Sequence, residues 1–180
     1  MARYIHRTPV RDAVGEAYTA KMGEYVSQLA KLGYEAIMYA YRDGHASGSA
    51  EKKPVGDGKW RHRSRNLHDS FASAVYVNGI LQEDSIYYIG GEYSRSEYGG
   101  MTGREYARQY LEDPAEDVSG DIALLCIAAM PYAEYLEEGT HKGGYKIRVI
   151  SGAADYIAAN WHRVKTDLFE IKKVRFIAGE

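Results

Sequence analysis

A stripe of apolar side chains is the first regular pattern along the chain, and it covers residues 12–41. Its spacings of three to five residues place the apolar positions on one face of an α-helix. Gly15, Gly23 and Gly33 each lower helix stability by up to ~1 kcal/mol relative to Ala, so the helix has positions at which it can kink. Gly44 suits a left-handed cap that ends it. The stripe consists of Val14, Tyr18, Met22, Val26, Leu29, Leu32, Ile37 and Ala40.

A β-hairpin is predicted from two β-type runs on either side of Asn78-Gly79. Residues 75–77 form the first arm and Ile80–Leu81 begin the second. Asn-Gly readily adopts the positive φ angles that a two-residue turn needs. The second arm resumes at residues 86–89, after a bulge expected near residues 82–84. We therefore predict two antiparallel strands in this region.

Two further elements are predicted in the middle of the chain. Thr102 and Glu105 have the spacing of a capping box, which predicts a short helix over residues 103–112. Residues 122–130, "IALLCIAAM", are continuously apolar. Such a run is typical of a central strand that is covered on both faces.

The last part of the chain is predicted to contain a turn, a strand and a second long helix. Pro131 ends the apolar strand and opens a helical turn over residues 132–137, with Gly139 as its exit. Residues 145–150 have a β-type composition. A long amphipathic helix is expected over residues 153–174. Its apolar positions are Ile157, Trp161, Val164, Leu168, Ile171 and Val174.

These elements together indicate an α+β fold with two long helices packed on a mostly antiparallel sheet. The chain has 180 residues and no break in composition, so we expect a single domain over residues 1–180. Two segments rich in glycine and polar residues, 44–65 and 90–102, are expected to be long mobile loops that become ordered on assembly.

Composition narrows the function classes. The net charge is −2, whereas dedicated DNA or membrane-surface binders are more often clearly cationic. The longest apolar run has about nine residues, well below the ~20 of a membrane span, and no signal-peptide pattern is present. We therefore expect a soluble protein made in a cytoplasm. Cys126 stands alone in the apolar run and is interpreted as a buried, inert thiol.

Tyrosine is unusually frequent, with 17 residues against three phenylalanines. Tyrosine combines an apolar ring with a polar tip and suits surfaces that become buried against a partner. Many of these tyrosines stand beside charged residues. A core that happens to use tyrosine and a partner interface both remain open as explanations.

A search for catalytic, metal and cofactor sites finds no convincing candidate. The closest set of histidines and acids is His62, His68 and Asp69, whose spacing matches no common metal signature. A hydrolase built on His68 and Asp69 would need a cleft in which the two converge. The glycine-rich stretches "VGDGKW" and "YGGMTGREY" lack the remaining residues of a phosphate-binding loop and are interpreted as turns. We expect no enzyme activity and no cofactor.

Two charged clusters suggest contacts with partners. The basic stretch consists of Lys59, Trp60, Arg61, Arg63 and Arg65. It has the chemistry to contact DNA phosphates with Trp60 as a stacking surface, to bind acidic residues of another protein, or to be a solvated loop. The acidic cluster of Glu134, Glu137 and Glu138 is interpreted as a solvated or interfacial face that pairs with a neighbouring subunit's Lys or Arg.

Two short segments resemble elements of one protein family. "SRNLHDSF", Ser64 to Phe71, resembles the "TGxLRxSI" element of the tail-completion or neck proteins of long-tailed bacteriophages. "PYAEYLEEGT" resembles the "YAxxvExGT" element of that family. Arg65 stands where the family has Gly, and His68 where it has Arg. The matching positions are Leu67, Ser70, Tyr132, Ala133, Glu137, Gly139 and Thr140, with Ser64 in place of Thr.

The resemblance implies a structural virion protein of the phage neck, without catalysis. Such a protein forms a ring of identical copies that joins or completes the tail. It is assembled in the cytoplasm of the bacterial host. The implied partners are further copies, connector or head-closure proteins, and tail-terminator or tail-tube proteins, with DNA passing through the lumen without sequence readout and no membrane contact.

Within the second element, the resemblance gives Tyr132 and Tyr135 the role of anchoring a strand-to-helix corner. Gly139 and Thr140 would then shape the reversal of the chain. Two alternatives stay open: a turn in an unrelated α+β fold, and a small nucleic-acid-binding or DNA-packaging accessory protein that uses the basic stretch.

Overall fold

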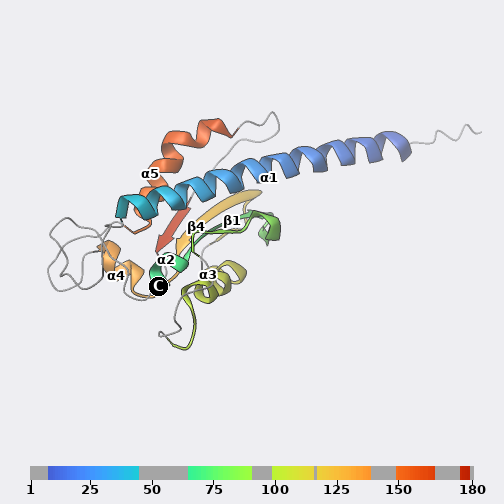
Figure 1. Ribbon diagram of the computed structural model, residues 1–180. Helices are drawn as coiled ribbons and strands as arrows, with labels where there is room; N and C mark the ends of the chain where they lie inside the picture. The colour runs from blue at the N-terminus through green and yellow to red at the C-terminus, as the bar shows by residue number, and fades with distance from the viewer. Residues whose placement is uncertain are drawn as a thin grey trace, which may run out of the picture.

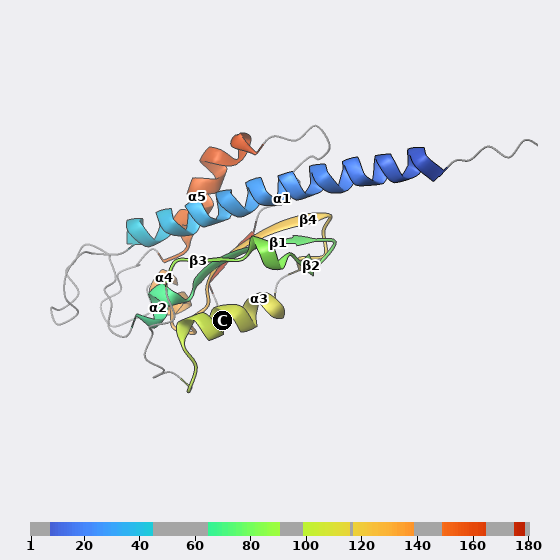
Figure 2. The same cartoon turned by 45° about the vertical axis from the view of Figure 1, so that its right-hand side comes forward.

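The computed structural model describes residues 8–44, 65–90, 99–115, 117–138, 149–164 and 175–178. Their elements form three layers, with α1 and α5 on one face of a sheet and α3 on the other (Figures 1 and 2). Most of the two expected mobile loops, namely residues 45–64 and 91–98, lies outside the described residues.

The first helix, α1 (Thr8–Gly44), is longer than the predicted helix at both ends. Its C-terminal part packs on the sheet through buried residues such as Leu29 and Ile37. Its N-terminal part extends beyond the end of the strands in both views (Figures 1 and 2). The helix is one element through Gly33, where a Cβ would lie 2.7 Å from Leu124 Cδ1. Gly33 is therefore a close-packing position on the sheet and not a break.

The sheet has five strands and is mostly antiparallel. The strand order is β2-β1-β4-β5, and β3 also pairs with β1. Strand β1 is antiparallel to β2, β3 and β4, whereas β4 and β5 are parallel. The predicted α+β class is confirmed. The strands are β1 (Phe71–Val77), β2 (Ile80–Leu81), β3 (Tyr87–Tyr88), β4 (Ile122–Ala128) and β5 (Arg175–Ala178).

The predicted hairpin is confirmed. Asn78 and Gly79 both have positive φ angles, 51° and 77°, and join β1 to β2. In place of the bulge expected near residues 82–84, the structure has a 3-10 turn, η1 (Glu83–Ser85). The hydroxyl of Ser85 accepts a hydrogen bond from Val75 N at 2.8 Å. The Ser85 side chain thus accepts the hydrogen bond of a β1 backbone N–H at the point where the second arm leaves the sheet.

Strand β4 is covered on both faces, as its continuous apolar run predicts. Leu124 and Cys126 face the layer of α1 and α5 (Ser151–Asn160), while Leu125 and Ile127 face α3 (Gly103–Glu112). The alternation follows from the two-residue period of a strand. The expected capping box of α3 is present: Glu105 N donates to Thr102 Oγ1 and Thr102 N donates to Glu105 Oε2. The predicted helical turn after β4 is also confirmed as α4 (Ala133–Glu138).

The prediction of a second long helix is wrong. Helix α5 has ten residues, a 3-10 turn η2 (Trp161–Arg163) follows it, and Val164 is extended. The predicted stripe required Trp161 to be buried, but its side chain is half-exposed. Asn160 Nδ2 donates to Tyr156 O at 2.8 Å, and such local bonds favour helix ends. The rest of the predicted stripe, at Leu168, Ile171 and Val174, lies outside the described part of the chain.

Three further features of the chain were not predicted correctly. The short helix α2 (Asn66–Asp69) and the strand β5 were not anticipated. The strand expected over residues 145–150 is not seen at its described end, because Val149 and Ile150 form a buried bend before α5. Among the described residues, no helix is both long and apolar enough to cross a membrane.

Candidate functional site

The structure brings the two family-like elements together at one end of the sheet. Phe71 at the start of β1 pairs with Ala128 at the end of β4, because the two strands are antiparallel. Ala129 N donates a hydrogen bond of 3.2 Å to Ser70 O. The segment before β1 and the segment after β4 therefore lie side by side, and α2 and α4 are close in both views (Figures 1 and 2). We name this end the motif corner and define it by Leu67, Ser70, Tyr132, Ala133 and Glu137.

The first half of the motif corner is a tight buried turn. Leu67 and Ser70 are buried, and Ser70 Oγ donates to Leu67 O at 2.8 Å. Ser70 N lies within hydrogen-bonding distance of Asn66 O and Leu67 O. The buried Ser70 hydroxyl therefore has its hydrogen-bond partner within the turn that leads into β1. Ser64, the remaining residue of the first element, lies outside the described residues.

Arg65 begins this turn in a left-handed conformation, with φ of 66°. A residue with a Cβ is strained there by about 1–2 kcal/mol, whereas glycine is not. The resembled family has Gly at this position. Arg65 therefore holds a left-handed turn although it carries a Cβ, and the strain lies in its own backbone.

The second half of the motif corner ends at a carboxylate that caps another helix. Ala133 is fully buried and Tyr132 packs half-buried against the core. Glu137 accepts hydrogen bonds from three successive backbone N–H groups, with its Oε2 2.6 Å from Val149 N and 2.8 Å from Ile150 N, and its Oε1 3.3 Å from Ser151 N.

These three N–H groups begin α5, whose own N-cap residue, Ile150, makes no side-chain cap. Glu137 supplies both the missing acceptor and a negative charge at the positive end of the helix dipole. The interpretation of Glu137 as a solvent- or neighbour-facing acid is therefore wrong, since its charge is used inside the chain. Glu134 is half-buried. The side chain of Glu138, together with Gly139 and Thr140, lies outside the description, as does the side chain of Tyr135.

His68 and Asp69 lie beside the motif corner and contact each other. His68 Nδ1 is 2.7 Å from Asp69 Oδ1, and the Tyr41 ring meets the imidazole edge-on at 4.8 Å between centroids. Asp69 is buried, and a Cβ at Gly90 would collide with it. The pair converges as a hydrolase would require, yet neither residue lines the pocket described next. A packed carboxylate that orients the histidine accounts for this geometry.

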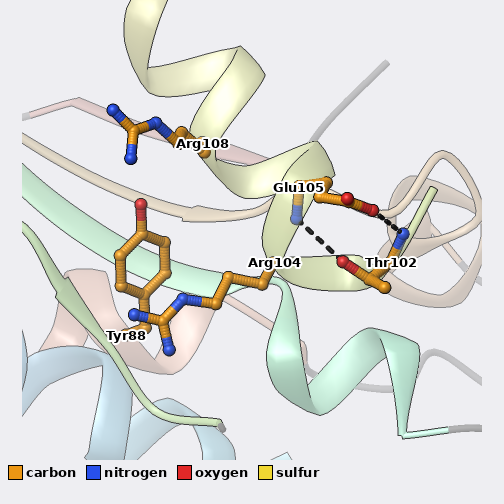
Figure 3. Close-up of a pocket in the computed structure, with 5 residues that line it drawn as sticks. All are labelled: Tyr88, Thr102, Arg104, Glu105 and Arg108. Carbon is orange, nitrogen blue, oxygen red and sulfur yellow. Dashed lines mark hydrogen bonds between the residues drawn. The ribbon is translucent and has the colours of Figure 1, made fainter. Parts of the chain in front are cut away.

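A surface pocket lies between β3 and the first turns of α3 (Figure 3). It is lined by Tyr88, Thr102, Arg104, Glu105 and Arg108. Arg104 Cζ lies 4.2 Å from the centroid of the Tyr88 ring, and Arg104 Nη1 donates to Gly90 O at 3.3 Å. Burial raises the pKa of Tyr88, although both arginines act in the opposite direction. The phenol is therefore neutral at physiological pH.

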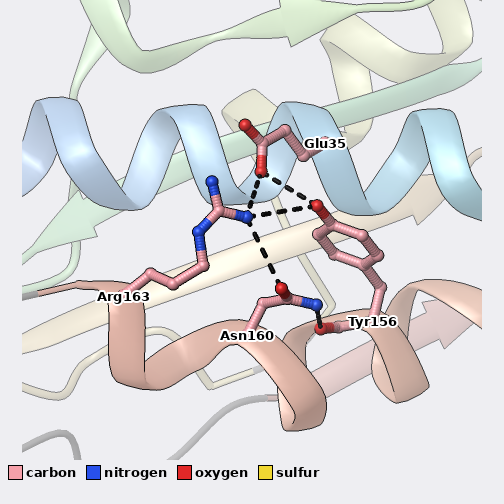
Figure 4. A network of polar contacts seen from close by, with 4 residues as sticks. All are labelled: Glu35, Tyr156, Asn160 and Arg163. Carbon is pink, nitrogen blue, oxygen red and sulfur yellow. Dashed lines mark hydrogen bonds and ion pairs between the residues drawn. The ribbon is translucent and has the colours of Figure 1, made fainter.

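A polar network joins α5 to the outer side of α1 (Figure 4). Glu35 Oε2 accepts from Tyr156 Oη at 3.0 Å and from Arg163 Nη1 at 2.9 Å. The Arg163 guanidinium also reaches Asn160 Oδ1 at 3.5 Å. The rings of Tyr39 and Tyr156 lie 5.3 Å apart beside it. This network fixes the end of α5 on the long helix and shows no reactive group.

The remaining groups of chemical interest are the Cys126 thiol, the possible metal ligands and the basic stretch. Burial raises the pKa of the Cys126 thiol to about 12, so the thiol is protonated at physiological pH. No three His, Cys, Asp or Glu side chains of the described ranges are arranged to hold one metal ion. Of the basic stretch, Lys59, Trp60, Arg61 and Arg63 lie outside the described residues, and Arg65 is exposed.

Two features of the site were missed from the sequence. Arg104 and Arg108 have the four-residue spacing of one helix face, a signal that was present in the sequence. The capping of α5 by Glu137 had no local signal, because the partner N–H groups come 12 to 14 residues later.

Comparison of the chain with protein-family models, with curated proteins and with solved structures gives no significant match.

Proposed function

We propose that this protein is a structural virion component of the phage neck, at the head–tail junction, which forms a ring that joins or completes the tail. The supporting observation is the motif corner. Two segments about sixty residues apart in the sequence, each resembling one element of the same family, meet at the same end of the sheet. Each described motif residue there has a structural role, in burial, turn closure or helix capping.

The exposed aromatic side chains support assembly as the protein's activity. Tyr34 of α1 and Tyr87 of β3 are both partly exposed, and their rings lie 5.3 Å apart. Such pairs offer a large apolar area with polar tips, the composition that is enriched at protein interfaces. Tyr18, Tyr39 and Trp161 are further exposed aromatic residues.

A ring requires head-to-tail contacts that close on themselves. In this proposal the partners are copies of the chain, connector or head-closure proteins, and tail-terminator or tail-tube proteins. DNA passes through the opening and is not read by sequence. The protein acts in the virion and is assembled in the bacterial cytoplasm.

Mass photometry of the purified protein, alone and with candidate connector proteins, tests the proposal. The expected result is a discrete oligomer that appears alone or on addition of the connector. The substitutions Tyr34→Ser and Tyr87→Ser should shift it towards monomer, whereas Glu24→Gln, at an exposed position of the same helix, should not. A protein that stays monomeric with every partner would contradict the proposal.

The alternative function is a small nucleic-acid-binding or packaging accessory protein. It is supported by the density of cations in the basic stretch, to which the exposed Arg65 belongs. It predicts a salt-sensitive DNA mobility shift that disappears when Arg61, Arg63 and Arg65 are changed to Ala. If DNA binding is absent, or survives the triple substitution, this alternative is wrong.

A further inference from the structure

The pocket of Figure 3 contains two arginines that no role assigned above uses. Arg104 and Arg108 are four residues apart on α3, so their side chains leave the same face of the helix. The Tyr88 ring lies between them: the Arg104 guanidinium stacks on it, and its hydroxyl points towards Arg108 in Figure 3. We propose that this pocket binds a single carboxylate group beside the Tyr88 ring, through the guanidinium groups of Arg104 and Arg108.

Both arginines have donors available for such a ligand. Stacking on Tyr88 and the bond from Nη1 to Gly90 O hold the Arg104 guanidinium in place. Arg108 donates through Nε to Glu112 Oε1 at 2.7 Å. Within the described ranges, no residue accepts a hydrogen bond from Arg104 Nη2 or from the Nη groups of Arg108. Each guanidinium presents its donors in one plane, as a fork that suits the two oxygens of a carboxylate.

The surrounding acids favour a ligand with one negative charge. Glu105 is turned towards the cap, where it accepts from Thr102 N at 2.6 Å, and it points away from the arginines (Figure 3). Glu112 is bound to Arg108, and Glu83 acts electrostatically on both Arg108 and Tyr88. Three carboxylates oppose a phosphate dianion or a nucleic-acid backbone more than they oppose one carboxylate. A ligand with one negative charge therefore accepts hydrogen bonds from the arginines with less electrostatic repulsion than a dianion would meet.

The carboxylate has two possible sources. It is either a small free carboxylate or the Asp or Glu side chain of a neighbouring copy; the second source rests on the proposed ring assembly. The pocket chemistry is the same for both. The binding test can be made with acetate on the monomer, so its outcome does not depend on ring formation.

The test is a titration of ¹⁵N-labelled protein with sodium acetate, followed through the arginine Nε–H and α3 amide resonances. Sodium chloride at the same ionic strength is the reference. We expect saturable shifts of the Arg104 and Arg108 signals with acetate only. Arg104→Gln should weaken binding about tenfold through loss of charge-assisted hydrogen bonds, and Arg104→Lys should also weaken it because Lys lacks the planar fork.

Two controls keep the result interpretable. Arg42→Gln, at an exposed position in the last turn of α1, should leave acetate affinity unchanged. Arg108→Gln is a second pocket variant that the fold should tolerate, because 63% of the Arg108 side chain is exposed. Shifts that are linear and equal in acetate and chloride would overturn the site. Tighter binding of inorganic phosphate than of acetate would overturn its assignment to a carboxylate.

The source of the carboxylate is decided by mass photometry of the same variants. If a neighbouring copy supplies it, Arg104→Gln and added acetate both reduce the oligomer. If a free molecule supplies it, the oligomer stays unchanged while acetate binding is lost in the variant.

Discussion

At the scale of single residues, the motif corner depends on positions whose roles are set by the backbone. Glu137 places one carboxylate on three N–H groups of α5, and Arg65 holds a left-handed turn that a glycine would adopt without strain. The two positions determine how α5 starts and how the chain enters β1.

Replacing Glu137 by Gln should lower the free energy of unfolding by about 1–2 kcal/mol, because the change removes a charge at a helix N-terminus and one acceptor of backbone N–H groups. Urea denaturation followed by circular dichroism measures the difference. Glu134→Gln in the same helix is the matched control, since its carboxylate makes no such cap. Equal losses in the two variants would show that the cap contributes nothing.

Replacing Arg65 by Gly should raise the free energy of unfolding by up to ~1 kcal/mol, because glycine relieves the positive φ. The gain is limited by the larger entropy of glycine in the unfolded chain. Arg65→Ala keeps a Cβ but removes the guanidinium, so it separates backbone strain from side-chain effects. If Ala stabilises as much as Gly, strain at this position is not the cause.

Cys126 makes stability depend on pH in the alkaline range. Burial raises the pKa of its thiol to about 12 in the folded protein, from an ordinary value of 9.0. The unfolded chain therefore loses the thiol proton first, and the free energy of unfolding falls as pH rises from about 9 towards 12, by at most ~1.4 kcal/mol per pH unit. Comparing wild type with Cys126→Ala by denaturation across this range isolates the contribution. Parallel pH profiles would contradict it.

At the scale of elements, the local signals were predictive and the long-range ones were not. The stripe of α1, the Asn78-Gly79 turn and the Thr102–Glu105 capping box each lie within a few residues of the structure they specify. The parallel pairing of β5 with β4 joins segments that are far apart in the chain, so no local sequence pattern predicts this pairing. The helix over residues 153–174 was over-predicted because periodicity alone does not show whether Trp161 finds a core.

The same principle applies to the candidate site. The resemblance named the motif residues, and their role as a family element stays a prediction. The i, i+4 spacing of Arg104 and Arg108 was visible in the sequence. Their grouping around Tyr88 required the fold, because β3 and α3 come from different parts of the chain. The contact of Glu137 with α5 was hidden for the same reason.

Gly23 and Gly33 test how α1 meets the sheet, since the same substitution in one helix should have different effects. A Cβ at Gly23 has no atom within 4 Å, whereas at Gly33 it would lie 2.7 Å from Leu124 Cδ1 and 3.1 Å from Ser73 Cβ. Gly23→Ala should stabilise by about 0.5–1 kcal/mol through helix propensity. Gly33→Ala should be at least ~1 kcal/mol less stable than Gly23→Ala because of overpacking. Equal thermal and urea stabilities would contradict this packing.

At the scale of the whole molecule, the described structure has a long helix that extends beyond a small three-layer domain (Figures 1 and 2). Exposed tyrosines lie on α1 and β3. This combination supports a protein that works through its contacts. The motif corner joins the segment before β1 to the segment after β4 and caps α5, while the exposed aromatic side chains are the proposed contact surface.

The most direct test of this account is the composition of purified virus particles from a phage that encodes the chain. Quantitative mass spectrometry combined with cryo-electron microscopy would give the copy number and the position of the protein. The account predicts a small, fixed number of copies in a ring at the head–tail junction. Absence of the protein from particles that are otherwise complete would contradict it.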